Sequence, residues 1–235
     1  MYLGLCIAFI VCGAITLVAY LLEKTKRYSL RAVLIKTVVS SFFLSLAIFC
    51  SYVNDGHAIN TFVTFGLILG LLGDIWLDLK YVYPNDDKIY TYAGFICFGV
   101  GHMMFVSGMF SQYFRDGHFL YILLPIVAAA LASGANLLLE KPMKLKFGEM
   151  KWTVTVYAFL LFMTPFSALS LSIMTGWTHP LLTMIFIGGI SFAISDLVLS
   201  GTYFGEGKDR PIDLILNYLF YYGAQFTIAF SLFFF

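Results

Sequence analysis

The chain has 235 residues, of which 60% are hydrophobic and 11% charged, with a formal net charge of +1. Soluble domains carry about 25% charged residues, so this composition, with a mean hydropathy of +0.89, excludes a soluble globular protein and indicates a membrane protein. The near-neutral charge gives no support to nucleic-acid binding, which needs a basic surface.

Apolar runs separated by short polar breaks predict eight transmembrane helices in an all-α bundle, because about 20 apolar residues suffice to cross a bilayer. The first run lacks the basic start and small-residue cleavage site of a signal peptide, so we expect it to be a span. No linker or repeat interrupts the chain, and residues 1–235 are predicted to form a single domain. The predicted spans are 2–22, 32–53, 58–79, 91–113, 119–139, 151–174, 180–203 and 212–234.

Lysine and arginine are concentrated in alternate connections between these spans. The first, third, fifth and seventh connections hold 12 of the 14 cationic residues. Because cytoplasmic loops are enriched in such residues, we expect these connections in the cytoplasm and both termini on the non-cytoplasmic side. Only Arg115 falls in an outer connection, and Lys36 lies just inside the second span. The 12 residues are Lys24, Lys26, Arg27, Arg31, Lys80, Lys88, Lys141, Lys144, Lys146, Lys151, Lys208 and Arg210.

Three aspartates and one histidine stand out within the predicted spans, where a charge costs about 2.5–3.5 kcal/mol on insertion scales. Asp74 and Asp78 are near the end of the third span, His102 is midway along the fourth, and Asp196 is late in the seventh. At about 1.5 Å per residue, the helix geometry puts Asp74 and Asp196 roughly 10 Å from the cytoplasmic end and His102 roughly 16 Å from it. Asp78 is two residues from Lys80, which leaves open that it reaches water at the interface.

Further polar residues from other spans fall in the same half of the membrane. They are Lys36, Asn136, Asn217 and Tyr221. This shared depth predicts a water-accessible cavity that opens toward the cytoplasm or the inner leaflet. For the two asparagines, hydrogen bonding between helices is an alternative to a functional role.

Two embedded carboxyl groups suit general acid–base chemistry, because burial allows one to stay protonated while the other is ionised. The sequence has no GxSxG elbow, HExxH, P-loop or dinucleotide fingerprint. Its four cysteines are scattered, with no CxxC spacing and no histidine beside them. We therefore expect no metal or organic cofactor, and acid-catalysed hydrolysis and proton-coupled transport remain.

Five short stretches, taken in order, resemble the lysoplasmalogenase or YhhN family. They read GLILGLLGDIWL, AGFICFGVGHMMFV, VYAFLLFM, ISDLVLS and YYGAQFTIAF, in the third, fourth, sixth, seventh and eighth predicted spans. The sequence departs from the family pattern at two points: Lys36 is followed by Thr37 instead of proline, and Asp78 stands at an apolar position. The resemblance implies that five residues of this chain occupy the family's functional positions. They are Asp74, His102, Tyr157, Asp196 and Gln225.

The resemblance implies hydrolysis of the vinyl ether bond of a lysoplasmalogen, giving a fatty aldehyde and glycerophosphoethanolamine or glycerophosphocholine. Asp74 and Asp196 would be the catalytic acid and base, as the two carboxyls of glycosidases are for a similar cationic intermediate, and His102 would orient a carboxyl or relay protons. A bacterial inner membrane and an endoplasmic reticulum both fit this reading. Substrate-binding roles are expected for Lys36, which would attract the phosphate, and for Asp78, Tyr157, Asn217, Tyr221, Tyr222 and Gln225.

Two alternatives belong to other functional classes. An intramembrane aspartyl protease also uses two embedded aspartates, but its GxGD motif needs glycine where this chain has Leu71, and Ser195 replaces the tyrosine of its YD motif. A proton-coupled transporter or lipid-binding membrane protein fits the embedded Asp and His residues. Transporters often show internal repeats and broken helices, and the sequence has no clear sign of either.

Overall fold

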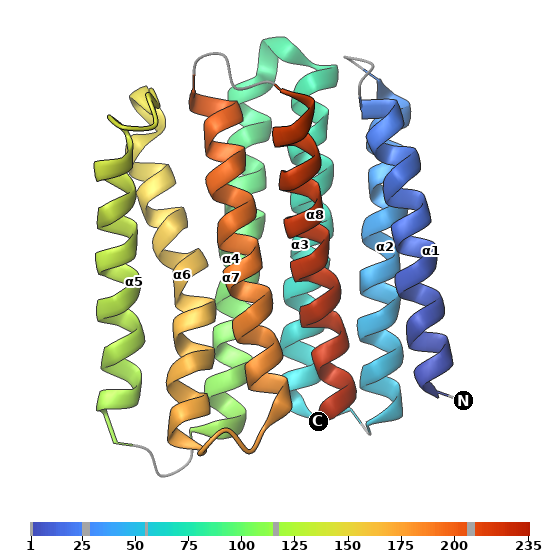
Figure 1. Cartoon of the computed structure of the whole chain (residues 1–235), viewed down its shortest axis with the longest axis vertical. Coiled ribbons are helices and arrows are strands. Elements are labelled where there is room, and N and C mark those ends of the chain that lie inside the picture. Colours follow the sequence, from blue (N-terminus) through green and yellow to red (C-terminus); the bar gives the residue numbers. More distant parts are fainter. Residues whose placement is uncertain (1, 25–28, 55, 115–117, 206–209) are drawn as a thin grey trace.

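A computed structural model describes residues 2–24, 29–54, 56–114, 118–205 and 210–235, and these are almost entirely helical (Figure 1). The described residues contain no strand, only an isolated bridge between Leu145 and Gly205. The long helices are α1 (Tyr2–Lys24), α2 (Leu30–Val53), α3 (Ala58–Val82), α4 (Asp87–Tyr113), α5 (Leu120–Leu139), α6 (Lys151–Met174), α7 (Pro180–Phe204) and α8 (Pro211–Ser231), with short 3₁₀ helices η1 (Pro84–Asp86), η2 (Gly148–Met150) and η3 (Leu232–Phe234).

The predicted helices are all present, and local sequence explains where several begin. Pro180 and Pro211 stand at the first positions of α7 and α8, where proline loses no helical hydrogen bond. The Ser29 hydroxyl accepts a hydrogen bond from the Ala32 amide and caps α2. Helices α3 and α4 extend past the predicted spans 58–79 and 91–113, because apolar patterning marks the lipid-facing part of a helix and not its end.

The helices lie side by side along one direction, and the chain passes up and down through the bundle (Figure 1). Helices α1, α3, α5 and α7 end, and α2, α4, α6 and α8 begin, at one end of the bundle, and the two ends of the chain lie at the other. We call the first the basic end, because it holds Lys24, Lys80, Lys88, Lys151 and Arg210. Lys26, Arg27, Arg115 and Lys208 lie outside the described residues.

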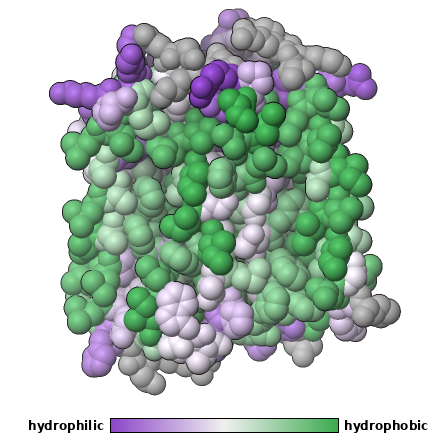
Figure 2. Space-filling model, in the orientation of Figure 1, coloured by the Kyte–Doolittle hydropathy of each residue, from purple (hydrophilic) through white to green (hydrophobic). Residues whose placement is uncertain are grey.

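Seven of the described helices, α1 to α7, are long and apolar enough to cross a membrane. A hydrophobic band covers the flank seen in Figure 2, and hydrophilic residues gather at the two ends. Helix α8 is not among the seven, although its 21 residues lie within the same bundle. Its buried face explains the difference, because polar groups there lower its mean hydropathy; they belong to Asn217, Tyr218, Tyr221, Tyr222 and Gln225.

The packing of α8 and α5 positions the site. Helix α8 packs extensively against α7 and also contacts α2 and α3, so its polar face meets the aspartates of α3. Helices α3 and α4 approach closely, since a Cβ added at Gly66 would lie 2.9 Å from the Gly101 carbonyl oxygen. Helix α5 packs mainly against α6, at the edge of the bundle.

Candidate active site

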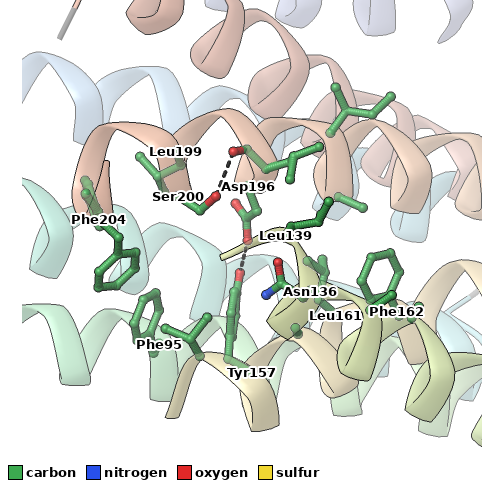
Figure 3. Close-up of a pocket in the computed structure, with 18 of the residues that line it drawn as sticks. Phe95, Asn136, Leu139, Tyr157, Leu161, Phe162, Asp196, Leu199, Ser200 and Phe204 are labelled. Atoms are coloured by element: carbon green, nitrogen blue, oxygen red, sulfur yellow. Dashed lines mark hydrogen bonds between the residues drawn. The ribbon is translucent and has the colours of Figure 1, made fainter. Parts of the chain in front are cut away.

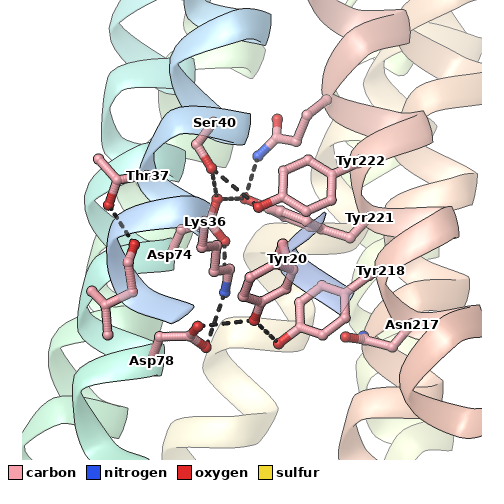
Figure 4. A network of polar contacts seen from close by, with 12 residues as sticks. Tyr20, Lys36, Thr37, Ser40, Asp74, Asp78, Asn217, Tyr218, Tyr221 and Tyr222 are labelled. Carbon is pink, nitrogen blue, oxygen red and sulfur yellow. Dashed lines mark hydrogen bonds and ion pairs between the residues drawn. The ribbon is translucent and has the colours of Figure 1, made fainter. Parts of the chain in front are cut away.

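A cluster of charged residues joins α1, α2 and α3, and Figure 4 shows its members Lys36, Asp74 and Asp78. Asp74 and Asp78 lie one turn apart on α3, and Lys36 Nζ is 3.1 Å from Asp74 Oδ1 and 3.5 Å from Asp78 Oδ1. Lys24 Nζ lies 2.7 Å from the same Asp78 oxygen. Lys36 and the two aspartates are each at most 3% exposed. Two cations thus balance two carboxylates in the interior, where an unpaired charge is costly.

Asp74 accepts hydrogen bonds from neighbouring hydroxyl groups as well as pairing with Lys36. Ser40 and Tyr221 donate to Asp74 Oδ2 over 2.5 and 2.8 Å. The Gln225 amide donates in turn to the Tyr221 hydroxyl over 3.0 Å. The contacts from Ser40 and Tyr221, shown in Figure 4, fix the position of the carboxyl.

Asp78 is held by α1 and supports the cluster from the basic end. The Tyr20 hydroxyl lies 2.8 Å from Asp78 Oδ2 and 2.7 Å from the Tyr218 hydroxyl. Asp78 is only 2% exposed. The possibility that it reaches water at the interface, which the sequence left open, is therefore wrong.

The second acidic site is Asp196 on α7, which accepts a hydrogen bond of 2.5 Å from the Tyr157 hydroxyl on α6 (Figure 3). The preceding residue, Ser195, donates to the Asn217 carbonyl and accepts from the Asn217 side chain, both over 3.0 Å. These bonds tie α7 to α8 and fix the height of Asp196 in the bundle. Asn217 thus has the helix-linking contacts that were the alternative to a functional role.

A large apolar pocket of about 410 Å³ lies between α5, α6 and α7, and we call it the lateral pocket (Figure 3). This volume falls within the range of small-molecule sites, about 300–1,000 Å³. Leu139 of α5 and Ile194 and Leu197 of α7 line the pocket and are 36–41% exposed, so the pocket opens between these two helices. Its few polar side chains belong to Asn136, Tyr157, Asp196, Ser200 and Tyr203.

A second, smaller pocket of about 30 Å³, the inner cavity, adjoins the lateral pocket. A water needs about 10–15 Å³ measured in this way, so there is room for about two. Asp74 and Asp196 both line the inner cavity, together with Lys36 and Tyr221. Five residues line both pockets: Phe95, Tyr157, Asp196, Leu199 and Tyr203. Asp196 therefore stands where the apolar pocket meets a water-sized cavity whose lining includes charged and polar side chains.

The structure keeps His102 apart from the two acids. Its Nδ1 lies 2.9 Å from Thr164 Oγ1, and its ring packs 4.8 Å from that of Phe192. Its Nε2 is buried and has no hydrogen-bond partner among the described residues. His102 lines neither pocket, so the structure gives it no contact with either carboxyl through which to orient it.

The other predicted site residues divide into two groups. Those that line the inner cavity are Lys36, Asp74, Tyr157, Asp196, Asn217 and Tyr221. Those that support it through the network are Asp78, Tyr222, whose hydroxyl lies 3.3 Å from Ser40 Oγ, and Gln225.

Sequence reasoning missed several members of the network. Ser40 and Tyr218 each lie one helical turn from a predicted site residue, Lys36 and Tyr222 respectively, and so share its helix face. That spacing was a usable signal. Tyr20 and Lys24 come from α1, and no pattern in the sequence connects them with residues on α3 and α8.

A model of the YhhN family matches residues 31–232, which takes in α2 to α8 almost completely and leaves α1 outside. No curated protein and no solved structure matches the chain.

Proposed function

The chain belongs to the YhhN family, and on that premise we propose that it is a membrane hydrolase that cleaves the vinyl ether bond of a lysoplasmalogen. The observation that carries the proposal is the position of Asp196, between an apolar pocket and an inner cavity shared with Asp74. A lysoplasmalogen has one apolar chain, and its reactive bond lies where that chain meets the polar glycerol. The chain would occupy the lateral pocket, with the bond beside Asp196.

Vinyl ether hydrolysis begins with proton transfer to carbon, and Asp196 is the group we assign to it. The pocket around Asp196 is mostly apolar, and an apolar surrounding favours the neutral carboxylic acid. Asp196 gives its proton to the β-carbon of the double bond, which leaves an oxocarbenium ion. The resulting Asp196 carboxylate and the nearby Asp74 stabilise this cation.

Water addition then completes the reaction, and Asp74 is the base. A water in the inner cavity attacks the cationic carbon and gives a proton to Asp74, whose carboxylate pairs with Lys36 and accepts hydrogen bonds from Ser40 and Tyr221. The hemiacetal collapses as its hydroxyl proton passes to the glycerol oxygen and the carbon–oxygen bond breaks. The proton on Asp74 returns to Asp196 through cavity water, so acid and base are regenerated.

The test is release of fatty aldehyde from 1-alkenyl lysophospholipid by protein purified in detergent. Detergent removes any membrane gradient, so product formation there distinguishes a hydrolase from a proton-coupled transporter. Stable binding of the lipid without any aldehyde would contradict the proposal and favour a lipid-binding membrane protein.

The lateral pocket predicts a dependence on chain length. Ala132 of α5 lines the pocket, whereas its neighbour Leu131 is 70% exposed and faces outward. Phenylalanine at position 132 would displace a few methylenes of a long chain, each worth about 0.8 kcal/mol. We expect Ala132→Phe to raise KM for long-chain substrates by about tenfold or more and to leave short chains nearly unaffected.

Leu131→Phe is the matched control for that change. It adds the same ring one residue away, outside the pocket lining. Equal effects of Ala132→Phe on long and short chains would argue against the lateral pocket as the chain site.

We further propose that α8 is the eighth span and that both termini face the non-cytoplasmic side. The odd-numbered connections, rich in lysine and arginine, would then face the cytoplasm, and both pockets lie in that half of the bundle. Single cysteines in a cysteine-free variant, at exposed Tyr2 and exposed Lys88, should react with an impermeant maleimide from opposite sides of the membrane. Labelling of both positions from the same side would contradict this topology.

A further inference from the structure

The lysines near the two pockets differ in how their charges are balanced. Lys24 and Lys36 pair with Asp74 and Asp78 at 2.7–3.5 Å. Lys80, in the last turn of α3, has no carboxylate within ion-pair distance in the part of the chain that the structure describes. Lys80 is thus the one lysine of these three that has no paired carboxylate in the described part of the chain.

Lys80 contacts a residue that lines both pockets. Its Nζ is 3.1 Å from the centroid of the Tyr203 ring, and Tyr203 lines the lateral pocket and the inner cavity. A cation over an aromatic face is stabilised by the ring, by about 0.5–2 kcal/mol, but its charge is not neutralised. Asp87, at the start of α4, and Asp78 attract Lys80, whereas Lys24 and Lys36 repel it, and none of the four lies within ion-pair distance of it.

The distance along α7 relates Lys80 to the reacting bond. Tyr203 follows Asp196 by seven residues, which is about 10 Å toward the basic end. In a lysophospholipid, three glycerol carbons separate the ether oxygen from the phosphate ester oxygen. With the vinyl ether at Asp196 and the chain directed away from the basic end, the phosphate comes to the level of Tyr203.

We propose that Lys80 binds the phosphodiester of the substrate headgroup. This inference rests on the proposed function and deepens it by naming the group that selects a phospholipid over an uncharged alkenyl glycerol. Lys36, which the sequence predicts to attract the phosphate, already lies between two carboxylates. The flexible four-carbon stem of Lys80 lets its ammonium turn from the Tyr203 ring to a phosphate oxygen.

A binding experiment tests Lys80 without requiring hydrolysis. The probe is a 1-O-alkyl lysophosphatidylethanolamine, which keeps chain and phosphate but lacks the vinyl bond, titrated into purified protein in detergent. We expect Lys80→Gln to weaken its binding about tenfold through loss of a charge-assisted contact, and Lys80→Arg to retain most of the affinity. Lys88→Gln is the control, because Lys88 is exposed and pairs with Glu149 on the surface.

A phosphate-free lipid separates phosphate binding from a structural role. We expect Lys80→Gln to leave the binding of 1-O-alkylglycerol unchanged. Equal weakening of both lipids by Lys80→Gln, unchanged binding of the phospholipid, or no phospholipid binding by the unaltered protein would each overturn the inference. If the protein binds the phospholipid through Lys80 but releases no aldehyde from the alkenyl analogue, the proposed hydrolysis fails, and Lys80 remains the phosphate-binding residue of a lipid-binding protein.

Discussion

Asp196→Asn is expected to lower the rate of aldehyde release by about 10²–10⁴-fold, the usual contribution of a general acid. Asparagine is nearly the same size as aspartic acid and retains an acceptor for the Tyr157 hydroxyl, but its amide has no acidic proton to give to carbon. The measurement is the initial rate at saturating substrate for purified variants in detergent. Tyr157→Phe removes the hydrogen bond to Asp196 but not its proton, so it should lose less activity.

Asp86→Asn provides the control for this change. Asp86 is an exposed acid in η1, and its replacement removes one carboxyl without touching either pocket. It should leave the rate unaltered, and thermal unfolding of each variant establishes that the fold is intact. Full activity of Asp196→Asn would refute the assignment of the proton donor, and full activity of Asp74→Asn would refute that of the base.

Lys36→Met is expected to destabilise the protein by about 3–5 kcal/mol, the usual cost of breaking a buried ion pair from one side. Methionine fills similar space but leaves Asp74 without a cation, in a site where both residues are at most 3% exposed. Asp78 keeps Lys24. The measurement is unfolding of the purified variants by SDS in mixed micelles.

Two further variants make this result specific. Lys88→Met breaks a surface pair in which both side chains are more than 60% exposed and should cost less than about 1 kcal/mol. Adding Asp74→Asn to Lys36→Met removes the unpaired charge and should restore part of the lost stability. If Lys36→Met unfolds like the unaltered protein, the cluster is not a buried ion-pair network.

The helices and the two central acids were predictable from local sequence, and the network was not. Apolar run length sets where helices lie, and the cost of a charge in lipid singles out Asp74 and Asp196. The contact between Tyr20 and Tyr218 joins residues 198 positions apart. It forms because α1 packs against α2 and α8, and local sequence does not predict that packing. His102 was selected for its depth in the membrane, but depth does not determine the direction in which a side chain points.

The opening of the lateral pocket between α5 and α7 has a consequence for kinetics. A molecule that enters there comes from within the lipid leaflet. The occupancy of the pocket is therefore set by the mole fraction of substrate among the membrane lipids, and not by its concentration in water. The two products of the proposed reaction then leave for different phases: the aldehyde stays with the lipids, and the water-soluble headgroup fragment departs at the basic end. Such partition removes both products from the site and draws the reaction toward completion.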